Sequence, residues 1–470
     1  MKHTCHLYIV ECNQILKLAY PIVLSQIGSF IVQLSDTIMV GSIGPTQIAA
    51  VAFAGNIYFF LYIFSIGLTF GITPIVGKLF TQGNTVKNRI YFQSSLILYF
   101  ILSIIICVLQ LAIMPFFKYF GQPDAVIMLA TPYYIVLSIS TIPLVMFYVF
   151  KQFLEGIGNT KLVMIIVVGS NLLNILLNYI LINGKCGVVA MECLGAGIAT
   201  LISRIIMVIT VVIYVLHNHK LQYYLHSFFS SAYYSMKAIK KVLKIGFPIS
   251  MQMTLEGSTF AFTGIMMGWF GTTVLAANQI AIIIANLSYL VISGFSAATT
   301  IRISHIYGEK KIYLFKNTVY SAFIVVLIWN IFTILVLSFT KNHLPYLFTT
   351  DIKVVEMTSF FLIFVCMYQI SDGIQNILIG FLRGVQKVKI ILYTASFAYL
   401  IVNLPLGYLF AFKLHLGPSG LWCSYIFGLT FAAIILYRKS LGVFRTLMVS
   451  SKTVKSVSKP WLTLYFLLSY

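Results

Sequence analysis

The sequence predicts an all-α integral membrane protein whose twelve transmembrane helices form two six-helix lobes. Three observations predict this fold class: the composition, the length of the apolar runs, and a repeat of the first half in the second. Of the 470 residues, 60% are hydrophobic and only 9% are charged, whereas a soluble domain carries about 25% charged residues. So few charges exclude a soluble enzyme, a disordered chain and a fibrous repeat.

Twelve apolar runs are long enough to cross a bilayer, which takes about 20 helical residues. The runs are continuously apolar and do not alternate over about 10 residues, so a β-barrel is not expected. In the first half the expected spans lie near residues 15–42, 47–72, 90–116, 124–150, 160–184 and 193–216. In the second half they lie near residues 242–269, 274–300, 314–339, 353–381, 388–412 and 418–438.

The basic residues predict the orientation of these spans. When successive connections are assigned to opposite sides of the membrane, one side carries 25 of the 31 Lys and Arg residues, the other carries five, and Arg204 lies inside the sixth span. Cytoplasmic connections are enriched in Lys and Arg, so both termini are expected in the cytoplasm. This bias accounts for most of the net charge of +21 and requires no nucleic acid or other acidic partner.

The spans divide the chain into an N-lobe at residues 15–216 and a C-lobe at residues 242–438. Three segments are expected outside the membrane: a cytoplasmic N-terminus at 1–14, a basic connection at 217–241 and a C-terminal tail at 439–470. The tail is basic and then apolar, a pattern compatible with a segment that lies on the membrane surface.

The second half of the chain repeats the first. At an offset of 227 residues the halves align without a gap for about 60 positions, and the alignment continues at offsets of 228 and 229. Aligned pairs include Pro21 with Pro248, Gly67 with Gly294, Thr73 with Thr300, Gly156 with Gly384, and Asn174 with Asn403. Because each half holds six spans, both halves insert in the same orientation, and a pseudo-twofold axis along the membrane normal relates them. This plan is typical of transporters that work by alternating access.

Three carboxylates are predicted deep inside spans: Asp36 in the first, Glu256 in the seventh and Asp372 in the tenth. An ionised carboxylate at the bilayer centre costs about 2.5–3.5 kcal/mol, so each should face the bundle interior and bind a cation or a proton. The alternative is a neutral, hydrogen-bonded structural acid. Tyr368 lies four residues before Asp372, which lets a phenol and a carboxylate converge on one ligand. The other seven acids, Glu155 among them, are placed in loops, tails or span ends, and Glu155 is given no role.

Two amide side chains in the fifth span, Asn174 and Asn178, also lie four residues apart. Their carbonyl oxygens can bind a hard cation and their amide groups can hydrogen-bond Asp36. The alternative is that they join neighbouring helices, as polar residues in membrane helices often do. Thr200 could add a hydroxyl group to the same site, although a bond to a carbonyl of its own helix is favoured by the sequence alone.

The sequence does not indicate nucleotide-dependent or cofactor-dependent chemistry. It contains neither a GxxxxGK[ST] phosphate loop nor a HExxH motif, so we do not expect ATP-driven pumping, an enzyme, or a metal site beyond one for Na⁺. The energy is expected from a Na⁺ or H⁺ gradient, at about 2.3 kcal/mol per unit charge per 100 mV. The seven Cys form no CxxC pair, and Cys186 and Cys193, which share one connection, are expected as separate thiols.

At this point the motifs resemble a known family. The segment from Pro21 to Gln82, with LSDTIMVGSIG and GLTFGITPIVGKLF, is similar to the multidrug and toxic compound extrusion (MATE) transporters. Its counterpart in the second half, GFPISMQMTLEGSTF, is similar to the NorM-type branch, and the resemblance covers about residues 15–440. It implies an antiporter of the bacterial inner membrane that exports small organic cations in exchange for Na⁺ or H⁺. A monomer is expected because one chain supplies both lobes.

The resemblance also implies roles for single residues. Those implied are Glu256, Tyr368 and Asp372 for a cation or proton site in the C-lobe, and Asp36, Asn174, Asn178 and Thr200 for one in the N-lobe. The register of Thr200 in this comparison depends on a loop. Pro21 matches a proline at which the first helix of some members bends, which implies a hinge.

Two other functions stay open. A flippase for lipid-linked saccharides has the same two-lobed plan and would be expected to carry a cationic cavity for pyrophosphate. Arg204 is the only base expected inside a span, against three acids, which favours a cationic substrate. A membrane-bound enzyme is a remote alternative, because no catalytic constellation is visible.

Overall fold

The computed structural model describes residues 2–226, 228 and 233–450 of the chain. All regular secondary structure in this described part is helical, as the composition predicts. Eleven helical segments of the described chain are long and apolar enough to cross a membrane. The stretch 451–470, which includes the apolar end expected on the membrane surface, lies outside the described residues.

The first half forms the spans expected for it, with boundaries shifted by a few residues at most ends. Its helices are α1 (Lys2–Gly41), α2 (Pro45–Thr69), α3 (Ile72–Thr81), α4 (Thr85–Ile113), η1 (Met114–Phe120), α5 (Asp124–Gly156), α6 (Thr160–Asn183) and α7 (Glu192–His217). The second expected span, near residues 47–72, is α2, and α3 continues it to Thr81, beyond the expected end. The break between them falls at Phe70 and Gly71.

The second half follows a short 3₁₀ turn, η2 (Gln222–Tyr224), in the connection. Its helices are α8 (Met236–Gly268), α9 (Thr272–Gly308), α10 (Leu314–Thr340), η4 (Leu344–Leu347), α11 (Ile352–Gly384), α12 (Val388–Ala395), η5 (Ser396–Asn403), α13 (Leu404–Tyr408), η6 (Leu409–Lys413) and α14 (Pro418–Ser450). The eleventh expected span combines α12, η5, α13 and η6, of which η5 and η6 are π-helical. The last helix extends to Ser450, into the expected tail.

The seventh expected span, α8, is not among the eleven apolar segments. Its 33 residues correspond to about 50 Å of helix, so its length suffices to cross a bilayer. Polar side chains, among them Gln252 and Glu256, lower its hydropathy. The same side chains belong to the candidate site described below.

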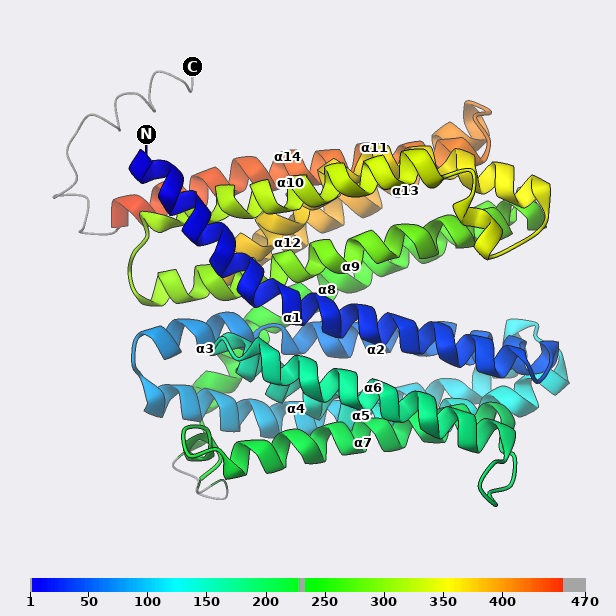
Figure 1. The fold of residues 1–470 in the computed structure, drawn as a ribbon, viewed down its shortest axis with the longest axis horizontal. Helices are drawn as coiled ribbons and strands as arrows, with labels where there is room; N and C mark the ends of the chain where they lie inside the picture. Colours follow the sequence, from blue (N-terminus) through cyan, green and yellow to red (C-terminus); the bar gives the residue numbers. More distant parts are fainter. Residues whose placement is uncertain (1, 227, 229–232, 451–470) are drawn as a thin grey trace.

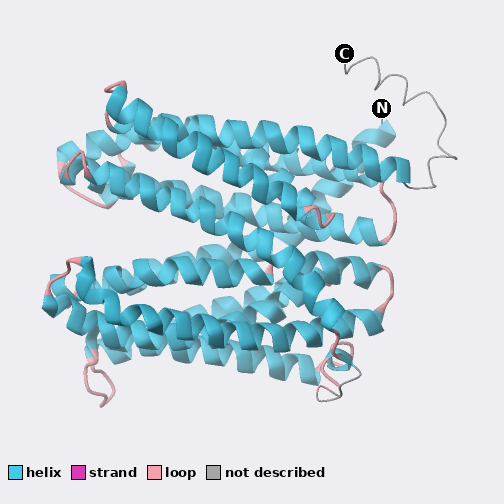
Figure 2. Cartoon of the chain, turned by 180° about the vertical axis from the view of Figure 1, so that it is seen from behind, coloured by secondary structure: helices cyan, strands magenta, loops and turns pink. Residues whose placement is uncertain are grey.

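The helices form two bundles that lie side by side (Figure 1). Helices α2–α7 form the first bundle and α8–α14 form the second, and the reverse view shows the same division (Figure 2). The start of α1 and the end of α14 lie at the same end of the molecule in Figure 1, which we call the termini end; the opposite one is the far end. Helix α1 starts against the second bundle, on α9 and α10, and continues along α6 of the first.

The start of α1 corrects one expectation about the N-terminus. The helix begins at Lys2 rather than near residue 15, and Glu11, expected in a tail, is only 3% exposed. Its carboxylate accepts hydrogen bonds from Arg302 at 2.6 Å and from Thr318 at 2.9 Å. The sequence gives no sign of this pairing, because the partners lie about three hundred residues away.

Contacts inside the two bundles repeat at the offsets found in the sequence. The Thr73 hydroxyl donates to the backbone oxygen of Gln152 at 3.0 Å, and its counterpart Thr300 donates to that of Gly380 at 3.1 Å. Gly77 on α3 packs on the side chain of Ser304 on α9, and these two residues are themselves counterparts, 227 positions apart. A contact between counterparts lies on the axis that relates the halves.

Glycine residues allow the two bundles to touch near the termini end. A Cβ atom added to Gly71 would lie 2.6 Å from the backbone nitrogen of Gly246, and one added to Gly67 would lie 2.7 Å from the Cα atom of Ser250. We call this contact of α2 and α3 with α8 and α9 the seam. Further along α8, a Cβ on Gly257 would still lie 3.2 Å from the Phe59 ring.

The seam does not continue to the far end. Gly264 lies about two turns beyond Gly257 on the same face of α8, and a Cβ added there would meet no atom within 4 Å. Gly55, one turn beyond Phe59 on α2, also has open space around it. The two helices therefore meet from the termini end to their middle and then diverge.

Substitution of alanine for glycine should have opposite effects on stability at the seam and in the region where α2 and α8 diverge. We expect Gly71→Ala to destabilise the protein by about 1–3 kcal/mol, because the added methyl group overlaps backbone atoms of α8. Gly264→Ala, in open space, should gain about 0.5–1 kcal/mol from helix propensity. Thermal unfolding of both variants in detergent measures this, and equal melting temperatures would contradict the tight seam.

Candidate functional site

Glu256 on α8 is held by neutral donors. The Gln252 amide, one turn earlier, donates to Glu256 Oε2 at 2.7 Å, and the Tyr399 hydroxyl group is a second hydrogen-bond partner. Arg383 Nη2 donates to the Gln252 oxygen at 2.9 Å. A guanidinium group is thus linked to the carboxylate through an amide and lies within Coulombic range of it.

Asp372 on α11 lies close enough to Glu256 for electrostatic repulsion. It is 6% exposed, and Asn376 donates to its Oδ1 at 2.9 Å. Gln375 on the same helix donates to the Tyr399 hydroxyl at 2.7 Å, so Tyr399 connects α11 with Glu256. Two carboxylates near one guanidinium group leave a net negative charge, which a cation or a proton can neutralise.

Tyr368 lies one helical turn before Asp372 and is 8% exposed. Its ring is stacked on the Trp422 ring, with centroids 6.4 Å apart, and is tilted against the Tyr425 ring at the same distance. The two aromatic rings of α14 therefore position this tyrosine beside the acidic pair. The structure thus brings Glu256, Tyr368 and Asp372 into one region of the second bundle.

The first bundle holds a second acidic group. Asn178 donates from one nitrogen to Asp36 Oδ1 and to Asn174 Oδ1, the latter at 3.1 Å. The Asn178 oxygen is buried and has no hydrogen-bond partner among the described residues. Three of the four residues expected in this lobe therefore lie together. The fourth, Thr200, donates to the Ala196 oxygen of its own helix at 2.9 Å, the alternative that the sequence favoured.

Arg204 lies within Coulombic range of Asp36. Its guanidinium group donates to the Tyr58 hydroxyl at 2.9 Å and to the Ser140 hydroxyl at 2.6 Å. The expectation that it is the only base inside a span is wrong. Lys151 is only 9% exposed, and Glu155, expected at a span end, is 3% exposed.

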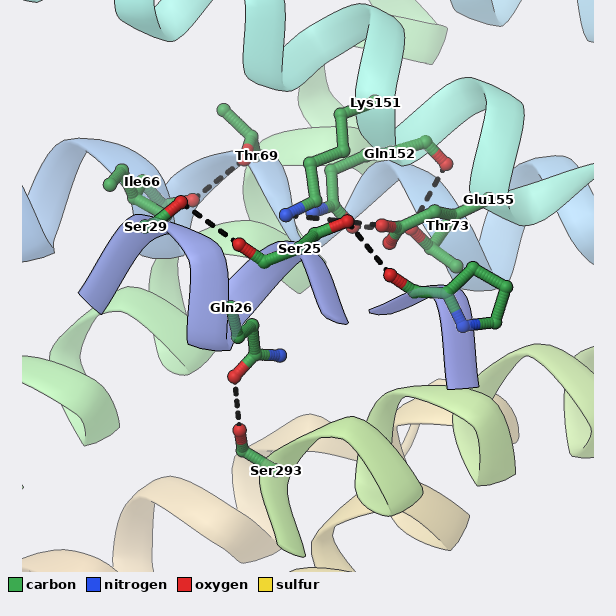
Figure 3. Close-up of polar contacts among 11 residues, drawn as sticks. Ser25, Gln26, Ser29, Ile66, Thr69, Thr73, Lys151, Gln152, Glu155 and Ser293 are labelled. Carbon is green, nitrogen blue, oxygen red and sulfur yellow. Dashed lines mark hydrogen bonds and ion pairs between the residues drawn. The ribbon is translucent and has the colours of Figure 1, made fainter. Parts of the chain in front are cut away.

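Polar side chains also gather where α1 crosses between the bundles (Figure 3). Gln26 on α1 accepts a hydrogen bond from Ser293 on α9 at 2.6 Å. Pro21 lies within α1, which continues through it, and its carbonyl oxygen accepts a hydrogen bond from Ser25 at 2.8 Å. The α1 helix is therefore tied to the second bundle by side chains close to its proline.

Sequence reasoning missed four side chains around the acidic pair. Gln252 and Asn376 lie four residues from Glu256 and Asp372, so their helical spacing was a usable signal. Arg383 was counted with the basic side of the membrane, yet it reaches back to α8. Tyr399 lies in the π-helical turn η5 on a different helix. No spacing rule connects it with the acids, although π-turns are frequent at functional sites.

Comparisons with known proteins agree with one another. The MatE family model matches residues 21–180 and again residues 248–409, at the offsets of the internal repeat. The multidrug resistance protein NorM of Vibrio vulnificus is 30% identical over 437 residues, 92% of this chain and 95% of its own length. A probable multidrug resistance protein NorM of Oceanobacillus iheyensis is 32% identical over 429 residues, 90% of this chain and 95% of its own length.

Solved structures share the fold. An outward-facing multidrug resistance MATE family transporter of the MOP superfamily superposes with a TM-score of 0.86 at 22% identity, over 94% of this chain and 97% of its own. A MOP superfamily transporter from Pyrococcus furiosus, for which a reversed polarity of the binding pocket is described, superposes with a TM-score of 0.85 at 22% identity, over 93% and 97% of the two chains.

The buried Gln252 amide bridges a carboxylate and a guanidinium group, and its removal should be costly. We expect Gln252→Leu to lower the free energy of unfolding by about 1–3 kcal/mol, because Glu256 and Arg383 each lose a hydrogen bond in a buried place. Thr200→Val is the control, since it removes only a bond to its own helix and should change stability by less than about 0.5 kcal/mol. Melting temperatures in detergent compare the two; equal losses would contradict the bridge.

Proposed function

Since the chain belongs to the MatE family, we propose that it is a multidrug efflux antiporter, which exports small organic cations in exchange for Na⁺ or H⁺. Two NorM relatives about 30% identical over nine tenths of the chain support efflux as its activity. The observation that carries the exchange is the pair of carboxylates inside the second bundle, the half-buried Glu256 and the buried Asp372, which lie within Coulombic range of each other. No covalent chemistry and no cofactor are part of the proposal.

In the second bundle, Glu256, Tyr368 and Asp372 form the proposed coupling site. A Na⁺ ion or a proton bound between the two carboxylates removes their repulsion, and its release restores the negative charge. An organic cation and the coupling ion then compete for the same charge. Binding of one therefore weakens binding of the other, which is the requirement for antiport.

In the first bundle, Asp36, Asn174 and Asn178 form the proposed second cation or proton site. The Asn178 oxygen without a partner is a ready ligand for a hard cation. Thr200 remains the fourth proposed member, since a hydroxyl group that donates to its own helix keeps its oxygen lone pairs for a cation. Pro21 is the proposed hinge: α1 contacts the second bundle on both sides of this residue, at Tyr8 and at Gln26, and reaches the first bundle further on, at Asp36. A proline weakens the helix there.

The position of the seam indicates which end of the molecule is open. The halves touch at the termini end, while α2 and α8 diverge toward the far end, so this state is open at the far end. We place the protein in the plasma membrane with both termini in the cytoplasm, on the bias of the basic residues. We propose a monomer, because one chain supplies both lobes. Transport then requires the seam to part and the far ends to meet.

Export of lipid-linked saccharides is the second candidate. It would need a cationic site for a pyrophosphate group. The half-buried bases Arg383 and Arg204 argue against it, because Arg383 lies within Coulombic range of Glu256 and Arg204 within Coulombic range of Asp36. Each of these positive charges is balanced by a carboxylate.

One substitution tests the coupling site. We expect Asp372→Asn to lower gradient-driven efflux of ethidium from proteoliposomes by about tenfold or more, equivalent to about 1.4 kcal/mol, because the amide can release no proton and repels no second acid. Asp351→Asn is the control. That residue caps the same helix by accepting from the Lys353 nitrogen at 2.9 Å, and Asn caps equally well, so efflux should be unchanged.

Separate Na⁺ and H⁺ gradients in this assay identify the coupling ion. Wild-type protein should respond to one of them. If Asp372→Asn, correctly folded by its melting temperature, transports as well as the wild type, the carboxylate pair is not the coupling site. If neither gradient drives wild-type efflux, the chain is not the proposed antiporter.

A further inference from the structure

A buried ion pair in the first bundle has no part in the function described so far. Lys151 and Glu155 lie one turn apart on α5, 9% and 3% exposed, with Nζ 3.9 Å from Oε1 (Figure 3). Removing two charges from water costs about as much as their attraction returns, so a buried pair contributes little stability. Stability therefore does not explain why the pair is present, and a functional role is the alternative.

The carboxylate of this pair is incompletely bound. At 3.9 Å the two groups attract each other but form no hydrogen bond, and Glu155 Oε1 has no hydrogen-bond partner among the described residues. The Lys151 ammonium group also lies 4.9 Å from the centroid of the Tyr148 ring. A carboxylate beside the face of an aromatic ring is the arrangement that binds organic ammonium groups. Here the ammonium group in that place belongs to the chain itself.

The pair lies directly behind the seam. The residue after Glu155 is Gly156, whose carbonyl oxygen is 2.7 Å from His305 Nε2 of α9 in the second bundle. A Cβ added to Gly156 would lie 2.9 Å from a methyl carbon of Val76 on α3. When the halves part at the termini end and His305 leaves Gly156, Glu155 is therefore among the first carboxylates exposed to that side.

The repeat shows that the fold does not need this pair. At the offset of 228 residues, Lys151 corresponds to Ile379 and Glu155 to Arg383. At the two equivalent positions the second bundle has an apolar side chain and a base. The neighbouring contacts of Thr73 and Thr300 are nevertheless the same in both halves. The acid is thus a feature of one half only.

We propose that Glu155 and the Tyr148 ring form an entry subsite for the ammonium group of an exported cation, which Lys151 occupies while the seam is closed. The proposal rests on the proposed function. In the state open at the termini end, a cytoplasmic organic cation displaces Lys151 from the carboxylate. When the seam closes, Lys151 returns and competes with the cation, which favours its release toward the far end.

Substitutions of the pair test this subsite in the full-length protein, with the fluorescent cation ethidium as the probe. Lys151→Met removes the internal competitor and should tighten ethidium binding by about tenfold, with a lower maximal rate of efflux because release is slower. Glu155→Gln should weaken binding and raise KM by about tenfold. In the double variant, which leaves neither charge unpaired, the gain from Lys151→Met should disappear.

An exposed pair of the same composition provides the matched controls. Glu309 and Lys311 lie at the same end of the molecule, 2.9 Å apart and on the surface. Glu309→Gln and Lys311→Met should therefore leave binding and KM unchanged. If the controls change ethidium binding as much as the buried variants do, the effect is a general one of surface charge and the subsite is wrong.

The outcomes separate this inference from the proposed function. If wild-type protein exports ethidium but the Lys151→Met and double variants bind it with wild-type affinity, the pair is structural and only the subsite is refuted. If no gradient drives export by the wild type, but Lys151→Met still tightens binding through Glu155, the antiporter is refuted and the ammonium site stands.

Discussion

The free-energy cost of placing a carboxylate among membrane helices is the constraint on which this structure depends. Asp36, Glu256 and Asp372 each accept a hydrogen bond from an amide side chain. An amide satisfies an oxygen atom but does not cancel its charge, so each group keeps its capacity for a cation. Glu11 differs, because two nitrogen atoms of Arg302 donate to its two oxygen atoms and leave it a structural role.

The fold was largely predictable because the bilayer restricts what a chain can do. Backbone groups in lipid must bond within their own segment, so an apolar run of sufficient length is a helix, and the expected spans coincide with the helices from α2 to α11. The internal repeat was equally readable, because positions at which the two halves approach each other closely hold glycine in both copies. Gly67 and Gly294 are counterparts for that reason: each lets a residue of the other half approach its backbone.

The candidate site was predictable only in part. Asn178 could be predicted as a partner of Asp36 because polar side chains of adjacent membrane helices tend to hydrogen-bond to one another. The helical turns before residue 15 could not be predicted from the sequence, because they depend on the distant partner Arg302. Tyr399 was missed for a similar reason, since a π-helical turn has no periodicity that a sequence displays. The burial of Glu155 and Lys151 was missed because each residue was considered alone. The opposite charge of Lys151, one turn away, offsets part of the free-energy cost of burying the Glu155 carboxylate.

The meeting of Gly77 with Ser304 has a consequence for how the molecule can vary. In a pair of identical six-helix chains, that position would face its own copy, and any charge there or nearby would confront a like charge. Joining both copies in one polypeptide lifts this restriction. It permits an acid at position 155 where the other copy carries Arg383, an electrical polarity between the halves that no homodimer could possess.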